Sequence, residues 1–111
     1  MIPSTWVAID QDADANIVAT KAAIADHRHF VTRITISFDI AVVDAVVATV
    51  KSGSTVIDQF EVPIAAIGAF VVRDYTSPRR GGTNEAITIT VPDPGSSVVC
   101  TAVVAGFTRP A

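Results

Sequence analysis

From His29 to Ile40 the sequence alternates between two sets of residues, and this pattern restricts the fold more than any other feature. The mainly apolar set is Phe30, Thr32, Ile34, Ile36, Phe38 and Ile40. The more polar set is His29, Val31, Arg33, Thr35, Ser37 and Asp39. A period of two is that of a β-strand that buries one face and turns the other toward water. The pattern therefore predicts a long strand over residues 28–40, with His29 and Arg33 on its outward face.

Most of the remaining chain has the pattern of shorter strands. Residues 45–51 and 55–62 flank Ser52-Gly53-Ser54, where glycine can take the positive φ of a tight hairpin, so these two segments should pair antiparallel. Residues 64–72 predict a loop followed by a short strand, and residues 77–84, with Pro78 and the pair Gly81-Gly82, predict a long exposed loop. Further strands are predicted at residues 16–24, 86–91 and 97–108.

The last predicted strand, residues 97–108, is apolar or small on both faces. Its alternating sets are Val99, Val103 and Phe107, and Val98, Cys100 and Val104. A strand that is wet on one side would carry a polar face, so this strand should lie in the centre of a sheet or under another subunit.

Together these elements predict an all-β protein. About seven strands without a convincing helix indicate a single-domain antiparallel β-sandwich of immunoglobulin-like or jelly-roll type, and periodicity does not choose between the two. A chain of 111 residues is large enough for one core and too short for two. We expect residues 16–111 to form the sandwich domain, and residues 1–15, which contain Pro3 and Trp6, to form an N-terminal arm.

Composition points to a protein that is partly covered by other proteins. Half of the residues are hydrophobic and 17% are charged, against a usual charged share of roughly a quarter, so some apolar surface should lie against a partner. The net charge of −3 argues against nucleic acid as that partner. We expect no membrane span and no secretion signal, and we expect the single cysteine, Cys100, to be a buried small hydrophobe.

No motif supports catalysis or a bound cofactor. The series Asp10, Asp12, Asp14 and Asn16 resembles a calcium loop, but Ala15 replaces the required glycine and Lys21 the closing glutamate. The other carboxylates are scattered at Asp39, Asp44, Asp58 and Glu61. Asp58 could point inward with a raised pKa, although a place near an edge or a hydrogen bond is the favoured interpretation. We expect no enzymatic activity, no metal and no cofactor.

Several side chains are candidates for contact with other proteins. His27 and His29 could in principle share a metal, but a third ligand is lacking, and a polar or interfacial strand edge is the favoured interpretation. Arg79 and Arg80 could clamp carboxylates of a neighbouring protein or could simply be solvated at a hairpin tip. Trp6 is a candidate anchor because tryptophan is enriched at binding hot spots. The predicted interface residues are Trp6, His27, His29, Arg33, Arg79 and Arg80.

The order of these features resembles a family. It consists of an Ala/Val-rich segment at residues 16–24, His-Arg-His-Phe-Val-Thr-Arg-Ile-Thr at 27–35, Lys-Ser-Gly-Ser-Thr-Val-Ile at 51–57, Arg-Gly-Gly-Thr-Asn-Glu-Ala-Ile-Thr-Ile-Thr at 80–90, and an apolar strand that ends in Gly106-Phe107. Over residues 16–107 it is similar to small virion proteins of tailed bacteriophages that decorate or cement a capsid shell. The resemblance carries no catalytic or ligand motif.

This resemblance implies a β-sandwich subunit, often trimeric, that is made in the host cytoplasm and then sits on the major capsid protein in the virion. Two other readings stay open. One is a phage tail or host-adhesion module that binds a carbohydrate or receptor, although few aromatic residues besides Trp6 and Tyr75 are available for stacking on sugars. The other is an immunoglobulin-like domain of a larger protein.

Overall fold

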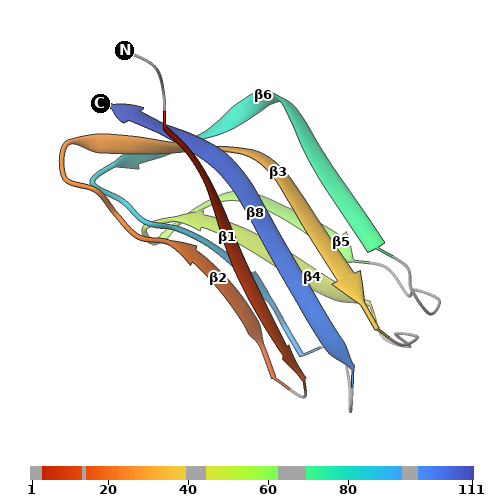
Figure 1. Cartoon of the computed structure of the whole chain (residues 1–111). Coiled ribbons are helices and arrows are strands. Elements are labelled where there is room, and N and C mark those ends of the chain that lie inside the picture. The colour runs from red at the N-terminus through yellow and green to blue at the C-terminus, as the bar shows by residue number, and fades with distance from the viewer. Residues whose placement is uncertain (1–3, 14, 40–44, 63–69, 94–97) are drawn as a thin grey trace.

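Two antiparallel sheets form the protein in the computed structural model, which describes residues 4–13, 15–39, 45–62, 70–93 and 98–111 (Figure 1). These residues contain eight strands. The strands are β1 (Ser4–Ala13), β2 (Ile17–Lys21), β3 (His27–Phe38), β4 (Val46–Ser52), β5 (Thr55–Val62), β6 (Phe70–Thr83), β7 (Ile87–Val91) and β8 (Val99–Pro110). Among the described residues no helix is long and apolar enough to cross a membrane.

The strand order identifies the type of sandwich. The sheets have the orders β1-β8-β3-β6 and β2-β7-β4-β5. Each strand pairs with the strand that is equally far from the other end of the chain, so β1 joins β8, β2 joins β7, β3 joins β6 and β4 joins β5. A long hairpin rolled up in this way is an eight-stranded jelly roll. The predicted β-sandwich is thus confirmed, and the jelly-roll alternative, not the immunoglobulin-like one, describes its topology.

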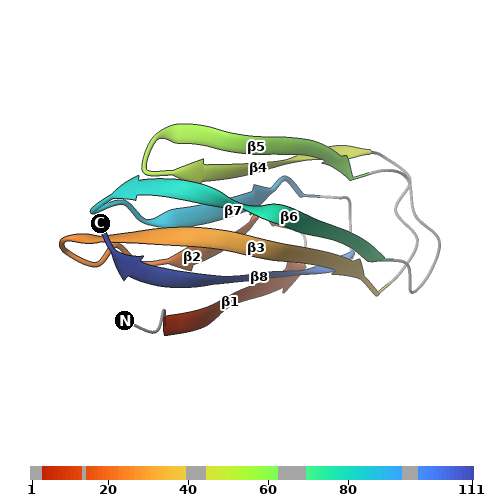
Figure 2. The same ribbon diagram turned by 90° about the horizontal axis from the view of Figure 1, so that it is seen from above.

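All eight strands run along one direction of an elongated molecule, whose extents are 44 × 23 × 18 Å (Figure 2). The core lies between the sheets. Most of its side chains come from alternate positions of the strands: Ile17, Ala19, Ile34, Ile36, Phe38, Ala48, Val50, Val62, Ile87, Ile89, Val91, Cys100, Ala102 and Val104. Cys100 is fully buried as predicted, and burial raises the pKa of its thiol to about 11.

Several predicted strands are confirmed, and the hairpin between β4 and β5 is the clearest case. Ser52 pairs with Thr55, and Gly53 has a φ of +57°, as the turn requires. The strands predicted at residues 86–91 and 97–108 are β7 and β8, and β8 is central, between β1 and β3. The strand predicted at residues 16–24 is shorter, since β2 covers only Ile17–Lys21.

Expectations about two segments are wrong. The predicted N-terminal arm contains a strand of the sandwich, because Ser4–Ala13 form β1 and pair with β8 along their whole length. The predicted loop at residues 77–84 is mostly strand, because β6 extends to Thr83 and pairs with β3 at Arg79 and Arg80. The strand expected at the end of residues 64–72 is accordingly long and not short; residues 63–69 lie outside the described part of the chain.

A bulge in β3 changes which face its side chains occupy. The pairing of β3 with both neighbours shifts between Val31 and Arg33. An extra residue in a strand exchanges the inward and outward positions on one side of the bulge. His29 and Val31 therefore point into the core, and Phe30 lies on the opposite face, which reverses the predicted assignment for this half of the strand.

Candidate protein interface

The outward side of β1 and β8 carries an apolar surface, which we call the outer face. It consists of Val7, Ile9, Val99, Val103, Ala105 and Phe107. The pairing places Val7 beside Ala105 and Ile9 beside Val103, so these four side chains form a continuous patch, and the pair Gln11 and Thr101 separates Val99 from it. Val7 and Ile9 are 62% and 64% exposed. Contiguous exposed apolar patches mark sites of protein interaction.

Trp6 lies in the core and not on an exposed arm. Its side chain is 8% exposed and meets the ring of His29 edge-on, with the ring centroids 5.8 Å apart. Its indole also covers Gly106, where a Cβ would collide with the Trp6 ring and with the Phe30 carbonyl oxygen. Trp6 is therefore a packing residue, and its predicted role as an exposed anchor is corrected.

His29, predicted to be outward, is buried and hydrogen-bonded at both ring nitrogens. Nε2 lies 2.8 Å from the carbonyl oxygen of Ala22, and Nδ1 lies against the Thr108 hydroxyl. Because a carbonyl can only accept, Nε2 carries the proton of the neutral ring and Nδ1 accepts from Thr108. Burial lowers the pKa of His29, although the bond to Ala22 acts in the opposite direction.

We expect His29 to make stability depend on pH. The lowered pKa means that the unfolded chain binds a proton more readily, so stability should fall as the pH drops below about 6.5, the usual His pKa. His29→Gln should remove this dependence, while His27→Gln should keep it. Thermal unfolding between pH 5 and pH 8 measures both. An unchanged pH profile in His29→Gln would contradict this role.

His27 and Arg33 make contacts that do not involve His29. His27 is half-buried, with Nδ1 2.8 Å from the Ala25 carbonyl oxygen. Arg33 is exposed and forms an ion pair with Asp74 at 3.3 Å. Within the described ranges, no three His, Cys, Asp or Glu side chains are grouped so that they could hold a metal ion.

The two sheets meet at the edge strands β5 and β6 through a polar network of Asp58, Arg73 and Tyr75. The guanidinium of Arg73 lies 3.1 Å from Asp58 and 5.2 Å from the centre of the Phe60 ring. The hydroxyl of Tyr75 donates to the same carboxylate. Burial tends to raise the pKa of Asp58, but the bonds from Tyr75 and Arg73 outweigh it, so the pKa lies below its usual value. Burial and the bond to Asp58 raise the pKa of Tyr75 to about 12.

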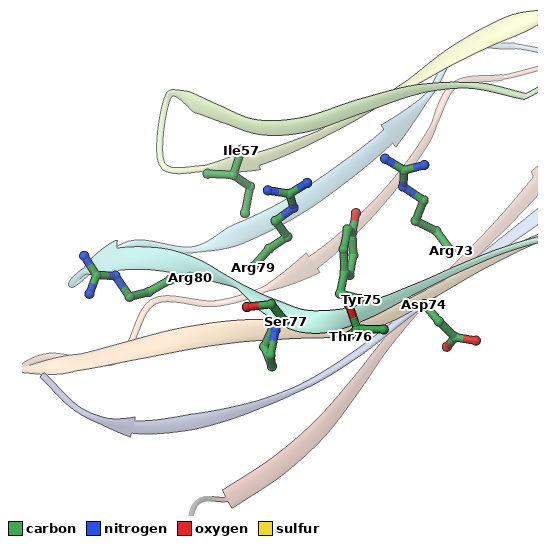
Figure 3. Close-up of a pocket in the computed structure, with 9 residues that line it drawn as sticks. Ile57, Arg73, Asp74, Tyr75, Thr76, Ser77, Arg79 and Arg80 are labelled. Atoms are coloured by element: carbon green, nitrogen blue, oxygen red, sulfur yellow. The ribbon is translucent and has the colours of Figure 1, made fainter.

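Next to this network β6 arches away from β3. Val31 pairs with Arg79 and Arg33 pairs with Asp74, so residues 75–78 have no partner on β3. Pro78, which lacks an N–H, is accommodated in this arch. A pocket of about 590 Å³ opens here, and Figure 3 shows Arg73, Tyr75 and Arg79 directed toward β5 and Arg80 directed away from it.

Both predicted arginines line this pocket, and Arg80 also lines a second one. Arg79 lies over the ring of Tyr75, 5.4 Å from its centre. Arg80 lines a second pocket, of about 470 Å³, together with Arg28 and Arg109, which the sequence-based interpretation missed. A signal was present, because Arg28-x-Phe30 and Phe107-x-Arg109 each place an arginine and an aromatic residue on the same face of a strand.

Comparison with known proteins adds little to this picture. No protein-family model matches the sequence, and a search of curated proteins gives no match. Among solved structures, the tobacco streak virus coat protein aligns with a TM-score of 0.42 and 15% sequence identity, over 99% of this chain and 87% of that chain. We draw no functional conclusion from a likeness of this strength.

Proposed function

We propose that the protein is a non-enzymatic structural component of a virion, and that it decorates or cements the capsid shell as a homotrimer. The observation that carries this proposal is the outer face, an apolar patch on a sheet in which β8, one of the two central strands, has apolar residues on both faces. Burial of such a surface stabilises a complex by roughly 25 cal/mol per Å² before the costs of association. The jelly-roll topology, which is used by viral capsid domains but also by lectin domains, is an analogy at the level of fold only.

The alternative of a sugar-binding adhesion module has less support from the described residues. Stacking on a sugar needs an exposed aromatic ring. Trp6 is buried, Arg73 and Arg79 lie over the ring of Tyr75, and Phe30 and Phe107 stack on each other beside Arg109. A decoration protein requires no exposed aromatic ring, since many weak contacts per trimer add through effective concentration.

A lysine on the outer face should weaken shell binding. We expect Ile9→Lys or Val103→Lys to weaken co-sedimentation with preformed capsid shells at least about tenfold, because a charge would be buried against protein. Val18→Lys is the matched control, since Val18 is 46% exposed on β2, in the other sheet. Equal binding by all three variants would contradict the proposal.

A further inference from the structure

The charges of the chain are separated along its length. The strand pairing places most Lys and Arg residues toward the end of the molecule where β1 begins and β8 ends, which we call the basic end. They are Lys21, Arg28, Lys51, Arg79, Arg80 and Arg109, with Asp26 and Glu85 among them. The other two cations, Arg33 and Arg73, are paired with carboxylates near the middle of the molecule. Most of the eight basic residues are thus available at one end.

The opposite end is acidic. Its carboxylates are Asp10, Asp12, Asp39, Glu61 and Asp93. Pairing places Asp12 beside Cys100, and Cys100 beside Phe38, so Asp12 and Asp39 lie close to the start of β8. Asp39 accepts a bond from the Val99 amide at 2.8 Å, and Asp10 accepts one from the Val18 amide at 2.9 Å. A carboxylate can accept about four hydrogen bonds, so each of these fixed groups can still receive an arginine.

At the basic end, three guanidiniums surround one pocket. Arg28, Arg80 and Arg109 line it, and none of its lining side chains is a carboxylate. Its floor is the stacked pair Phe30 and Phe107, whose ring centroids are 4.7 Å apart with an interplanar angle of 9°. The Arg109 guanidinium rests 4.7 Å from the centre of the Phe30 ring. We call this the arginine pocket.

The arginine pocket is already shaped for an anion. The aromatic floor holds Arg109, and Arg28 donates to the Thr83 hydroxyl at 3.2 Å, so two of the three guanidiniums are oriented before any ligand arrives. Guanidinium groups match the planar carboxylate by paired hydrogen bonds. Preorganised donors lose less conformational entropy on binding, which favours association.

We propose that the arginine pocket binds the acidic end of a second copy of this chain, so that copies join head to tail. Such a contact uses two different surfaces of one protein and gives a closed ring when its rotation closes. It would supply the subunit contact of the homotrimer and rests on the proposed function for that ring. Carboxylates fit better than nucleic acid phosphates, because the acidic end and the net charge of −3 repel a polyanion.

Charge exchange between the two ends tests this contact. Arg80→Glu with Arg109→Glu, or Asp12→Lys with Asp39→Lys, should each weaken self-association at least about tenfold, whereas all four changes in one chain should restore it. Light scattering gives the mass, and circular dichroism verifies folding. In the unmodified protein, raising NaCl from about 50 to about 500 mM should lower the mass toward that of one chain, because salt screens exposed charges.

Three results would overturn the inference. The first is an unmodified protein that is a monomer at low salt, and the second is a mass that neither salt nor the double variants change. The third is a folded fourfold variant that stays monomeric. Tight binding of a single-stranded oligonucleotide that is lost in Arg80→Glu with Arg109→Glu, without a change in mass, would assign the pocket to nucleic acid instead.

The double variants replace no residue of the outer face, but Arg109 lies over Phe107, which belongs to it. Shell binding is therefore compared in Asp12→Lys with Asp39→Lys, and the two proposals can fail separately. Shell binding by a protein that never self-associates would leave the virion function standing and reject the head-to-tail contact. Loss of the oligomer in the double variants, together with no shell binding by the unmodified protein, would do the reverse.

Discussion

Replacement of Trp6 by alanine should lower the free energy of unfolding by about 3–5 kcal/mol, the usual range for truncating a buried tryptophan or phenylalanine. The indole is 8% exposed and fills the space between the His29 ring and the backbone at Gly106. An alanine would leave a cavity there, and the fixed backbone of β3 and β8 on either side could not collapse to fill it. The loss should therefore fall in the upper part of that range.

Val7 provides a matched control for Trp6, because it is the next residue in β1 but points to the opposite side. It is 62% exposed, so Val7→Ala should change the free energy of unfolding by no more than about 0.5 kcal/mol. Urea unfolding followed by circular dichroism measures both variants. If Trp6→Ala unfolded like Val7→Ala but no longer bound capsid shells, Trp6 would be a contact residue and its burial would be irrelevant.

The case of Trp6 shows what the sequence reveals about this fold and what it hides. Alternation predicted β3, β7 and β8, where apolar and polar positions differ or where both faces are apolar. In β1 the contrast is lost, because Trp6 and Ala8 face the core while Val7 and Ile9 form the outer face. Because apolar residues and aspartates occur without a clear alternation, the sequence of β1 looks like that of an irregular arm.

Other errors arose where the regular period is interrupted. The bulge at Thr32 and Arg33 contains no glycine or proline, so nothing local signalled that His29 would turn inward. In β6, Pro78 and the two glycines predicted a loop. The arch absorbs the proline, and the amide of Gly82 donates to the Ser52 hydroxyl at 2.8 Å, so these residues remain within a strand.

The sequence predicted those parts of the candidate interface that lie within one segment and missed those that join distant segments. Arg79 and Arg80 stood out because they are adjacent, and the apolar β8 indicated a covered or central strand. The network of Asp58, Arg73 and Tyr75 could not be assembled from the sequence, because β5 and β6 belong to different sheets. Only the rolling of the hairpin brings these edges together, and this is a long-range property of the chain. For Asp58 the favoured expectation of a hydrogen bond is nevertheless confirmed.

Removal of Arg73 should cost the protein about 2–3 kcal/mol of unfolding free energy. Its partner Asp58 has a side chain that is only 9% exposed, and a buried carboxylate without its cation is strongly unfavourable. The loss should stay below the roughly 3–5 kcal/mol of a fully buried pair, because Arg73 itself is 43% exposed and Tyr75 still donates to Asp58. Arg33→Ala is the control, since its ion pair with Asp74 is exposed on both sides and should contribute at most about 1 kcal/mol.

The pH dependence of the Arg73→Ala variant separates this electrostatic effect from a loss of packing against Phe60. In the unmodified protein the pKa of Asp58 lies below its usual value, so the network stabilises the fold above about pH 4 and the contribution disappears as the pH falls further. Without Arg73, burial is less opposed and the pKa of Asp58 should rise. Acid unfolding of Arg73→Ala should then begin at a higher pH than that of Arg33→Ala. If both variants lost stability over the same pH range, Arg73 would act by covering Phe60 and not by holding the charge of Asp58.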